Sequence, residues 1–131
     1  MSNNSSGMQS ELTKVRGLGS AKSGTQHFWH QRVTALANIP LAFLTLWVVL
    51  SSLDGGYQAA LGMLANPLLG VGVLLFVLSA FYHASLGLAN VIEDYVGGEG
   101  ARMVALLCMR FSLIILGLLS IVSILKIIVQ G

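Results

Sequence analysis

His83 is the residue of this sequence best placed for chemistry, because it is the histidine that lies inside a long apolar stretch. Ionisable side chains are costly to bury in such surroundings, and where they occur they commonly serve a function. An imidazole there can ligate a metal or relay a proton, or it can hydrogen-bond a neighbouring helix. We expect a ligand or relay role for His83, and the packing role stays open.

Small residues surround His83 if the stretch is helical. At 100° per residue its helix face is shared by Gly72, Phe76, Ser79, Ala80, Gly87, Asn90 and, where the helix continues, Asp94. Small side chains let another helix or a flat cofactor approach the backbone closely. The pattern predicts a contact face and does not identify what that face contacts.

A histidine with small neighbours in a dry helix bundle suits a haem, whose iron an imidazole nitrogen binds axially. A haem that only transfers electrons generally has two axial ligands, and the chain offers one at this depth. His27 and His30 precede the first apolar stretch, whereas His83 lies eleven residues, about 16 Å of helix, from Asp94. We therefore expect His27 and His30 to be interfacial and a second chain or copy to supply the other ligand.

Asp94 and Tyr95 end the same stretch, on or beside the face of His83. A tyrosine at a membrane boundary commonly anchors a helix in the interface, and an aspartate there is commonly a solvated helix end. The functional alternative is a hydrogen-bond donor and a proton relay that face a lipid-soluble substrate. Both interpretations stay open on the residues alone.

The arginines have structural interpretations as well as functional ones. Arg32 and Arg102 lie at the starts of apolar stretches, where basic residues fix the orientation of membrane helices. Arg110 lies deeper, and it can extend to the interface or pair with an anionic group in the bundle. Cys108 is expected to be a buried apolar filler.

Three long apolar stretches must position these residues. Val33–Leu53 and Pro67–Ile92 carry no acidic or basic residue apart from His83, and Met103–Val129 carries only Arg110 and Lys126. About 20 apolar residues cross the hydrocarbon core of a bilayer. The expected fold is an all-α membrane protein with three transmembrane helices near 33–53, 67–92 and 103–125. These helices belong to one membrane domain over 27–131, preceded by a flexible polar tail over 1–26.

The composition agrees with this fold. Of 131 residues, 55% are hydrophobic and 9% are charged, which leaves too little polar surface for a small soluble domain. The net charge of +2 gives no indication of a nucleic-acid partner. The single cysteine excludes an internal disulfide and a cysteine-based metal site within one chain.

The orientation follows from the basic residues in the short flanks. Lys14, Arg16, Lys22 and Arg32 precede the first span, and the 54–66 loop has no lysine or arginine. Arg102 lies in the second loop. The positive-inside rule therefore predicts a cytoplasmic N-terminus and second loop, and a periplasmic C-terminus.

The order of these residues resembles the small hydrophobic membrane-anchor subunit, the D subunit, of succinate dehydrogenase (respiratory complex II). The resemblance rests on His83, then Gly87 and Asp94-Tyr95, with Arg102 seven residues later and Arg32-Val33-Thr34-Ala35 before the first span. The stretches Val15-Arg16-Gly17-Leu18-Gly19-Ser20 and His27-Phe28-Trp29-His30-Gln31-Arg32 are similar to alphaproteobacterial members in particular. The similarity extends over nearly the whole chain from about residue 14.

The resemblance implies a subunit that pairs with a second three-helix anchor, the cytochrome b556-type C subunit. It also implies docking of the flavoprotein and iron–sulfur subunits on the cytoplasmic side of the bacterial inner membrane, with the mitochondrial inner membrane as the second possibility. By the same resemblance, His83 ligates haem b together with a ligand from the partner anchor. Tyr95 would hydrogen-bond ubiquinone, Asp94 would tune or protonate that quinone site, and Arg32 would lie near a haem propionate.

The sequence offers three alternatives to a succinate dehydrogenase anchor. A fumarate-reductase anchor belongs to the same redox class, and direction of electron flow is not set by this chain. A non-redox membrane scaffold would use the small-residue face only to pack helices. A pore former would line one face with repeated polar groups, whereas the polar residues here cluster at one end of the second stretch. This asymmetry favours a site over a channel.

Overall fold

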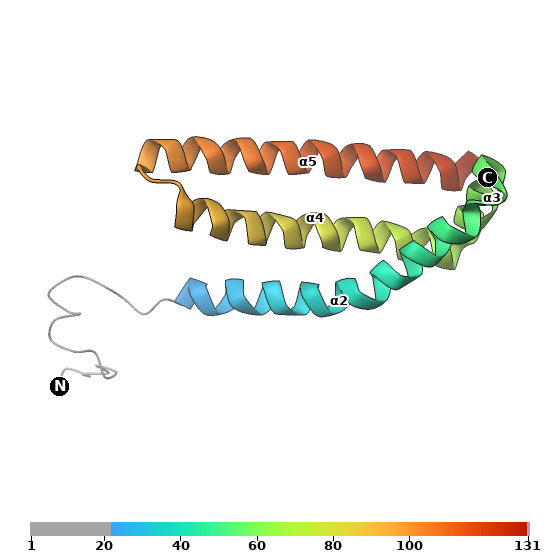
Figure 1. Ribbon diagram of the computed structural model, residues 1–131, viewed down its shortest axis with the longest axis horizontal. Coiled ribbons are helices and arrows are strands. Elements are labelled where there is room, and N and C mark those ends of the chain that lie inside the picture. Colours follow the sequence, from blue (N-terminus) through green and yellow to red (C-terminus); the bar gives the residue numbers. More distant parts are fainter. Residues whose placement is uncertain (1–21, 131) are drawn as a thin grey trace, which may run out of the picture.

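The computed structural model describes residues 22–130, and helices make up nearly all of this range. Helix α4 lies between α2 and α5, and the short α3 closes one end of the molecule (Figure 1). The helices are α2 (Lys22–Ser52), α3 (Gly56–Ala65), α4 (Pro67–Tyr95) and α5 (Glu99–Gln130). Three of the described helices, α2, α4 and α5, are long and apolar enough to cross a membrane. The predicted all-α fold with three membrane-spanning helices is confirmed.

The long helices extend beyond the predicted spans. With 29 and 32 residues, α4 and α5 are about 44 and 48 Å long, more than the hydrocarbon core requires. Helix α2 begins at Lys22, inside the segment expected to be a polar tail, because adding a residue to an existing helix costs little. The remainder of that predicted tail, residues 1–21, lies outside the described part of the chain.

Helix α3 (Gly56–Ala65) is an element that the sequence does not predict, since it falls within the expected 54–66 loop. Its sequence, GYQAALGMLA, contains several strong helix formers. Gly56 starts the helix with a φ of +61°, a conformation that L residues rarely adopt. At the other end the Asn66 side-chain oxygen accepts a hydrogen bond from the Leu68 N–H at 3.0 Å, and Pro67 takes the first position of α4.

Helix α2 bends partway along its length (Figure 1). Pro40 lies inside this helix, where its ring removes one main-chain donor and clashes with the preceding turn. Both halves of α2 contact α4, through Thr34 before the bend and Leu44 after it, and the second half leads to α3.

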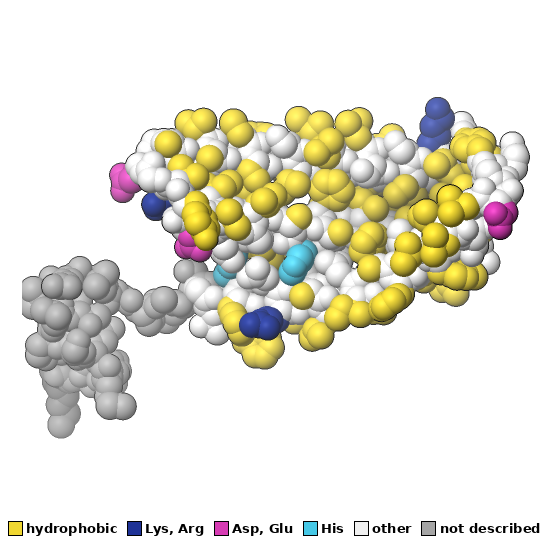
Figure 2. Space-filling model, viewed as in Figure 1, with side chains coloured by type: hydrophobic (Ala, Val, Ile, Leu, Met, Phe, Trp, Pro, Cys, Tyr) yellow, Lys and Arg dark blue, Asp and Glu magenta, His cyan; other side chains and the backbone are white. Residues whose placement is uncertain are grey.

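Few side chains are buried in the described part of the chain. Among residues 22–130 the buried hydrophobic ones are Val48, Val73 and Ala89, and many large apolar side chains are exposed. Figure 2 shows hydrophobic side chains spread over the visible face, with the charged ones mainly toward the two ends. Cys108 is also exposed, contrary to expectation, because α5 packs against the bundle along one side only. Such a surface suits lipid and further membrane helices.

Candidate functional site

His83 lies where α4 packs against α2, and its side chain is half-buried. Its Nδ1 atom is 3.0 Å from the hydroxyl oxygen of Thr34 on α2. Within the described residues no hydrogen bond is made to the other ring nitrogen, Nε2. His83 therefore has one ring nitrogen engaged by its own chain and one available to a ligand.

The small-residue face of α4 packs against α2, so the predicted contact face is confirmed and α2 occupies much of it. A Cβ atom on Gly72 would lie 3.0 Å from the Leu44 side chain, and one on Gly87 would lie 4.0 Å from Nε2 of Gln31. Asn90 donates a hydrogen bond to the Gln31 side-chain oxygen at 3.2 Å. Packing against α2 therefore accounts for the small side chain at Gly72, whereas a Cβ atom at Gly87 would make only ordinary van der Waals contact.

His30 lies much closer to His83 than the sequence analysis expected. Its Nδ1 atom is 2.6 Å from the hydroxyl of Tyr82, the residue next to His83. The centroids of the His30 and Tyr82 rings are 6.0 Å apart. The expected separation in depth is wrong, because α2 begins at Lys22, so His30 already lies in the part of α2 that runs alongside α4. Histidine side chains accordingly appear along the line where α2 meets α4 (Figure 2).

Sequence reasoning missed the α2 residues that contact α4. Gln31, Thr34 and Asn38 follow one another at spacings of three and four residues, which places them on one face of α2. Polar residues at this spacing inside an apolar stretch are the signal that could have identified the contact. Tyr82 carried no comparable signal, because tyrosine is common in membrane helices near an interface.

Asp94 and Tyr95 lie at the end of α4, and both side chains are exposed. Tyr95 is 84% exposed, so its hydroxyl is open to a ligand or partner. The structure does not bring these two residues to His83, which lies eleven residues, about 16 Å, further along the same helix.

Arg102 fixes the turn that follows Tyr95. Its Nε and one terminal nitrogen each donate to the Val96 carbonyl at 3.4 Å, and its side chain is half-buried. Gly98 in this turn has a φ of +89°, which again requires glycine. The residue predicted to anchor topology thus also holds the end of α4 against the start of α5.

Arg32 is exposed, and its guanidinium lies over the Phe28 ring, 5.1 Å from the ring centroid. This is a cation–π contact one turn apart on the same helix. Arg32 and Thr34 are two residues apart, about 3 Å along the axis of α2 and about 200° around it. The guanidinium itself lies over Phe28, one turn nearer the start of α2 than the Arg32 backbone, and it is exposed to an anionic group.

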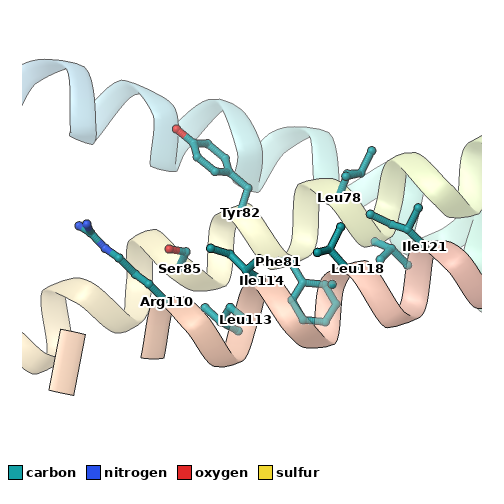
Figure 3. A pocket seen from close by; sticks show the side chains of 11 residues that line it. Leu78, Phe81, Tyr82, Ser85, Arg110, Leu113, Ile114, Leu118 and Ile121 are labelled. Atoms are coloured by element: carbon teal, nitrogen blue, oxygen red, sulfur yellow. The ribbon is translucent and has the colours of Figure 1, made fainter. Parts of the chain in front are cut away.

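A groove of about 370 Å³ separates α4 from α5 on the side of α4 away from His83. Its lining is almost entirely apolar, with Arg110, Ser85 and Tyr82 as its polar residues. Figure 3 shows the Arg110 guanidinium reaching to one end of this groove, beyond Ser85. Arg110 therefore does not face His83, and both of its predicted roles stay open.

Comparison with known proteins gives a consistent family. A model described as the succinate dehydrogenase/fumarate reductase transmembrane subunit matches residues 6–125. The chain is 30% identical over 102 residues to a succinate dehydrogenase hydrophobic membrane anchor subunit of Rickettsia bellii, covering 78% of this chain and 82% of the relative. Similar subunits of Rickettsia conorii and Paracoccus denitrificans are each 35% identical, over 98 and 93 residues. These alignments cover 72% and 71% of this chain and 75% and 71% of those relatives. No solved structure matches.

Proposed function

Because the chain belongs to the succinate dehydrogenase/fumarate reductase transmembrane subunit family, we propose that it is the hydrophobic membrane anchor of a succinate:ubiquinone oxidoreductase. One observation carries the proposal beyond family membership. A membrane-spanning helix holds a histidine with a free ring nitrogen, and the same helix ends in the exposed pair Asp94 and Tyr95. A redox ligand and a hydrogen-bonding site for a lipid-soluble substrate are the two components that this function needs.

The residues of this chain fit haem b. Nε2 of His83 can serve as one axial ligand, and no cluster of three metal-ligating side chains occurs among residues 22–130 to suggest another kind of metal site. When bound, the haem supplies one-electron transfer within the membrane. Arg32 is exposed, and its guanidinium, which lies over Phe28 one turn nearer the start of α2, can pair with a carboxylate such as a haem propionate.

The chemistry of the quinone site assigns roles to Tyr95 and Asp94. Reduction of ubiquinone to ubiquinol takes up two electrons and two protons, while oxidation of succinate to fumarate supplies both electrons. Tyr95 donates a hydrogen bond to a quinone carbonyl, and Asp94 passes protons from water at the membrane surface. The end of a spanning helix suits both tasks, because an isoprenoid tail reaches it from the bilayer and water reaches it from outside.

The need for a second haem ligand also identifies a partner subunit. This chain supplies one ligand, so a second anchor, the C subunit, must supply the other, and the iron–sulfur and flavoprotein subunits dock beside Asp94 and Tyr95. The curated relatives from Rickettsia and Paracoccus support the bacterial inner membrane as the location. Their names also favour succinate dehydrogenase over a fumarate reductase.

Omitting this chain from the complex tests the proposal. The other three subunits are expressed with and without it, and succinate oxidation is followed with ubiquinone and with an artificial dye. We expect ubiquinone reduction in the membrane only when the chain is present, and dye reduction by the soluble subunits in both cases. Ubiquinone reduction in membranes at an equal rate without the chain would contradict the anchor function.

A further inference from the structure

The hydroxyl of Thr34 has a single proton, and its neighbours determine where that proton goes. Thr34 Oγ1 lies 2.7 Å from the His30 carbonyl oxygen and 3.2 Å from the Gln31 carbonyl oxygen. Carbonyl oxygens only accept hydrogen bonds, so the Thr34 proton is directed at them. The hydroxyl oxygen then has only lone pairs to offer to His83.

This assignment determines the tautomer of His83. Its Nδ1 atom is 3.0 Å from Thr34 Oγ1, a longer contact than the 2.7 Å from Oγ1 to the His30 carbonyl oxygen. With the Thr34 proton on that carbonyl, Nδ1 carries a proton and donates it to the hydroxyl. In a neutral imidazole the other nitrogen, Nε2, then carries the lone pair. The two nitrogens lie on different sides of the ring, so Nε2 is directed away from Thr34 and α2.

The position of Thr34 relative to His83 is held by other contacts between the same two helices. Asn90 bonds Gln31 on one side of the pair, and Gly72 accepts the Leu44 side chain on the other. These contacts fix how far α2 can slide along α4. The hydrogen bond is therefore part of a defined interface.

We propose that Thr34 is a positioning residue that holds His83 in the Nδ1-protonated tautomer and so presents Nε2 to the haem iron. The inference rests on the haem role proposed above for His83. A hydrogen bond from the second nitrogen of a ligating histidine fixes the ring and makes the ligand more basic, and its loss commonly costs 10- to 100-fold in affinity. A more basic ligand favours ferric over ferrous iron, so Thr34 also lowers the haem midpoint potential.

The test compares Thr34→Val with Thr34→Ser in the assembled four-subunit complex, and Thr45→Val is the matched control. Thr45 lies on the same helix, and its buried hydroxyl has no hydrogen-bond partner in the described part of the chain. We expect Thr34→Val to raise the haem midpoint potential and to lower haem affinity about 10- to 100-fold. Thr34→Ser should restore both properties, and Thr45→Val should change neither.

Equal midpoint potentials and haem contents in Thr34→Val and Thr45→Val would overturn the proposal. A purely structural role would lower the yield of complex without changing the potential of the haem that is bound. If Thr34→Val does not assemble, Thr34→Ala compared with Thr34→Ser gives the same contrast, and equal potentials again refute it. A His83→Ala complex that keeps its low-spin haem would instead refute the haem role itself.

Discussion

His30 and His83 lie on facing helices, yet their ring nitrogens have different partners. His30 contacts the Tyr82 hydroxyl at 2.6 Å and is exposed, whereas His83 contacts Thr34 and is half-buried. His83→Ala should therefore remove or shift the low-spin haem spectrum of the assembled complex, because it deletes the proposed haem ligand. His30→Ala removes a neighbouring imidazole and should leave the spectrum in place.

Reduced-minus-oxidised spectra of the two purified complexes measure this difference. An unchanged axial-ligand signature in the His83→Ala complex would contradict the assignment. Loss of the signature in His30→Ala alone would transfer the ligand role to that histidine.

Tyr95 and Asp94 have counterparts of the same types at the opposite end of the molecule. Tyr57 and Asp54 are also exposed, but Tyr57 lies in the first turn of α3 and Asp54 in the turn before it. Tyr95→Phe deletes only a hydroxyl, so the complex should assemble with its haem and reduce ubiquinone at least several-fold more slowly. Asp94→Asn should act similarly, because acid–base groups contribute about 10²- to 10⁴-fold to rates.

Succinate oxidation is measured with ubiquinone and with an artificial dye, which separates a defect in the quinone site from a loss of succinate oxidation itself. Dye reduction should be retained in all variants, and the controls Tyr57→Phe and Asp54→Asn should reduce ubiquinone at the parental rate. If Tyr95→Phe and Asp94→Asn also do so, these residues are a membrane anchor and a solvated helix end.

At the scale of the elements, long apolar runs were sufficient to predict the three spanning helices, because each run exceeds the length that a bilayer needs. Helix α3 was not predicted because its ten residues, which lie between glycines and an Asn-Pro pair, are too few to show a clear helical periodicity of apolar side chains. The small residues Gly72 and Gly87 predicted a contact face but not its occupant. Which helix fills such a face depends on long-range packing that one sequence does not encode locally. For the same reason the sequence alone did not predict the contact between Thr34 and His83.

Gly70 lies where α4 closely approaches both α3 and α5. A Cβ atom there would lie 2.6 Å from the Leu64 carbonyl oxygen and 2.9 Å from the Ile128 side chain. Gly70→Ala should therefore lower the free energy of unfolding by about 1–3 kcal/mol, since main chain must move. Gly62→Ala is the control, because nothing lies within 4 Å of its Cβ position, and helix propensity favours alanine by up to about 1 kcal/mol.

Thermal unfolding of the purified complex in detergent measures both changes. Equal unfolding temperatures for Gly70→Ala and the parent would show that α3, α4 and α5 adjust without cost.

At the scale of the whole molecule, the two ends differ in composition. The start of α2, the end of α4 and the start of α5 share one end (Figure 1), which carries Arg102 and the pair Asp94 and Tyr95, and Arg32 lies in the half of α2 nearer this end. The other end contains α3 and the end of α5, with Lys126 as the basic residue of its last turns. The proposed quinone site and the proposed docking surface for soluble partners therefore lie at the same end, where electrons, protons and quinone could meet.

The positive-inside rule assigns the end that carries Arg32 and Arg102 to the cytoplasm, because short flanks rich in lysine and arginine are retained there. Alkaline phosphatase, which is active only in the periplasm, should accordingly be active when fused after Gly131. Green fluorescent protein, which fluoresces only in the cytoplasm, should fluoresce when fused after Gly98, where α4 has already returned the chain to its starting side. Exchanging the two reporters provides the control, since each should then be silent. Fluorescence from the fusion after Gly131 would invert the topology and would place Asp94 and Tyr95 on the side of the membrane away from the succinate-oxidising subunits.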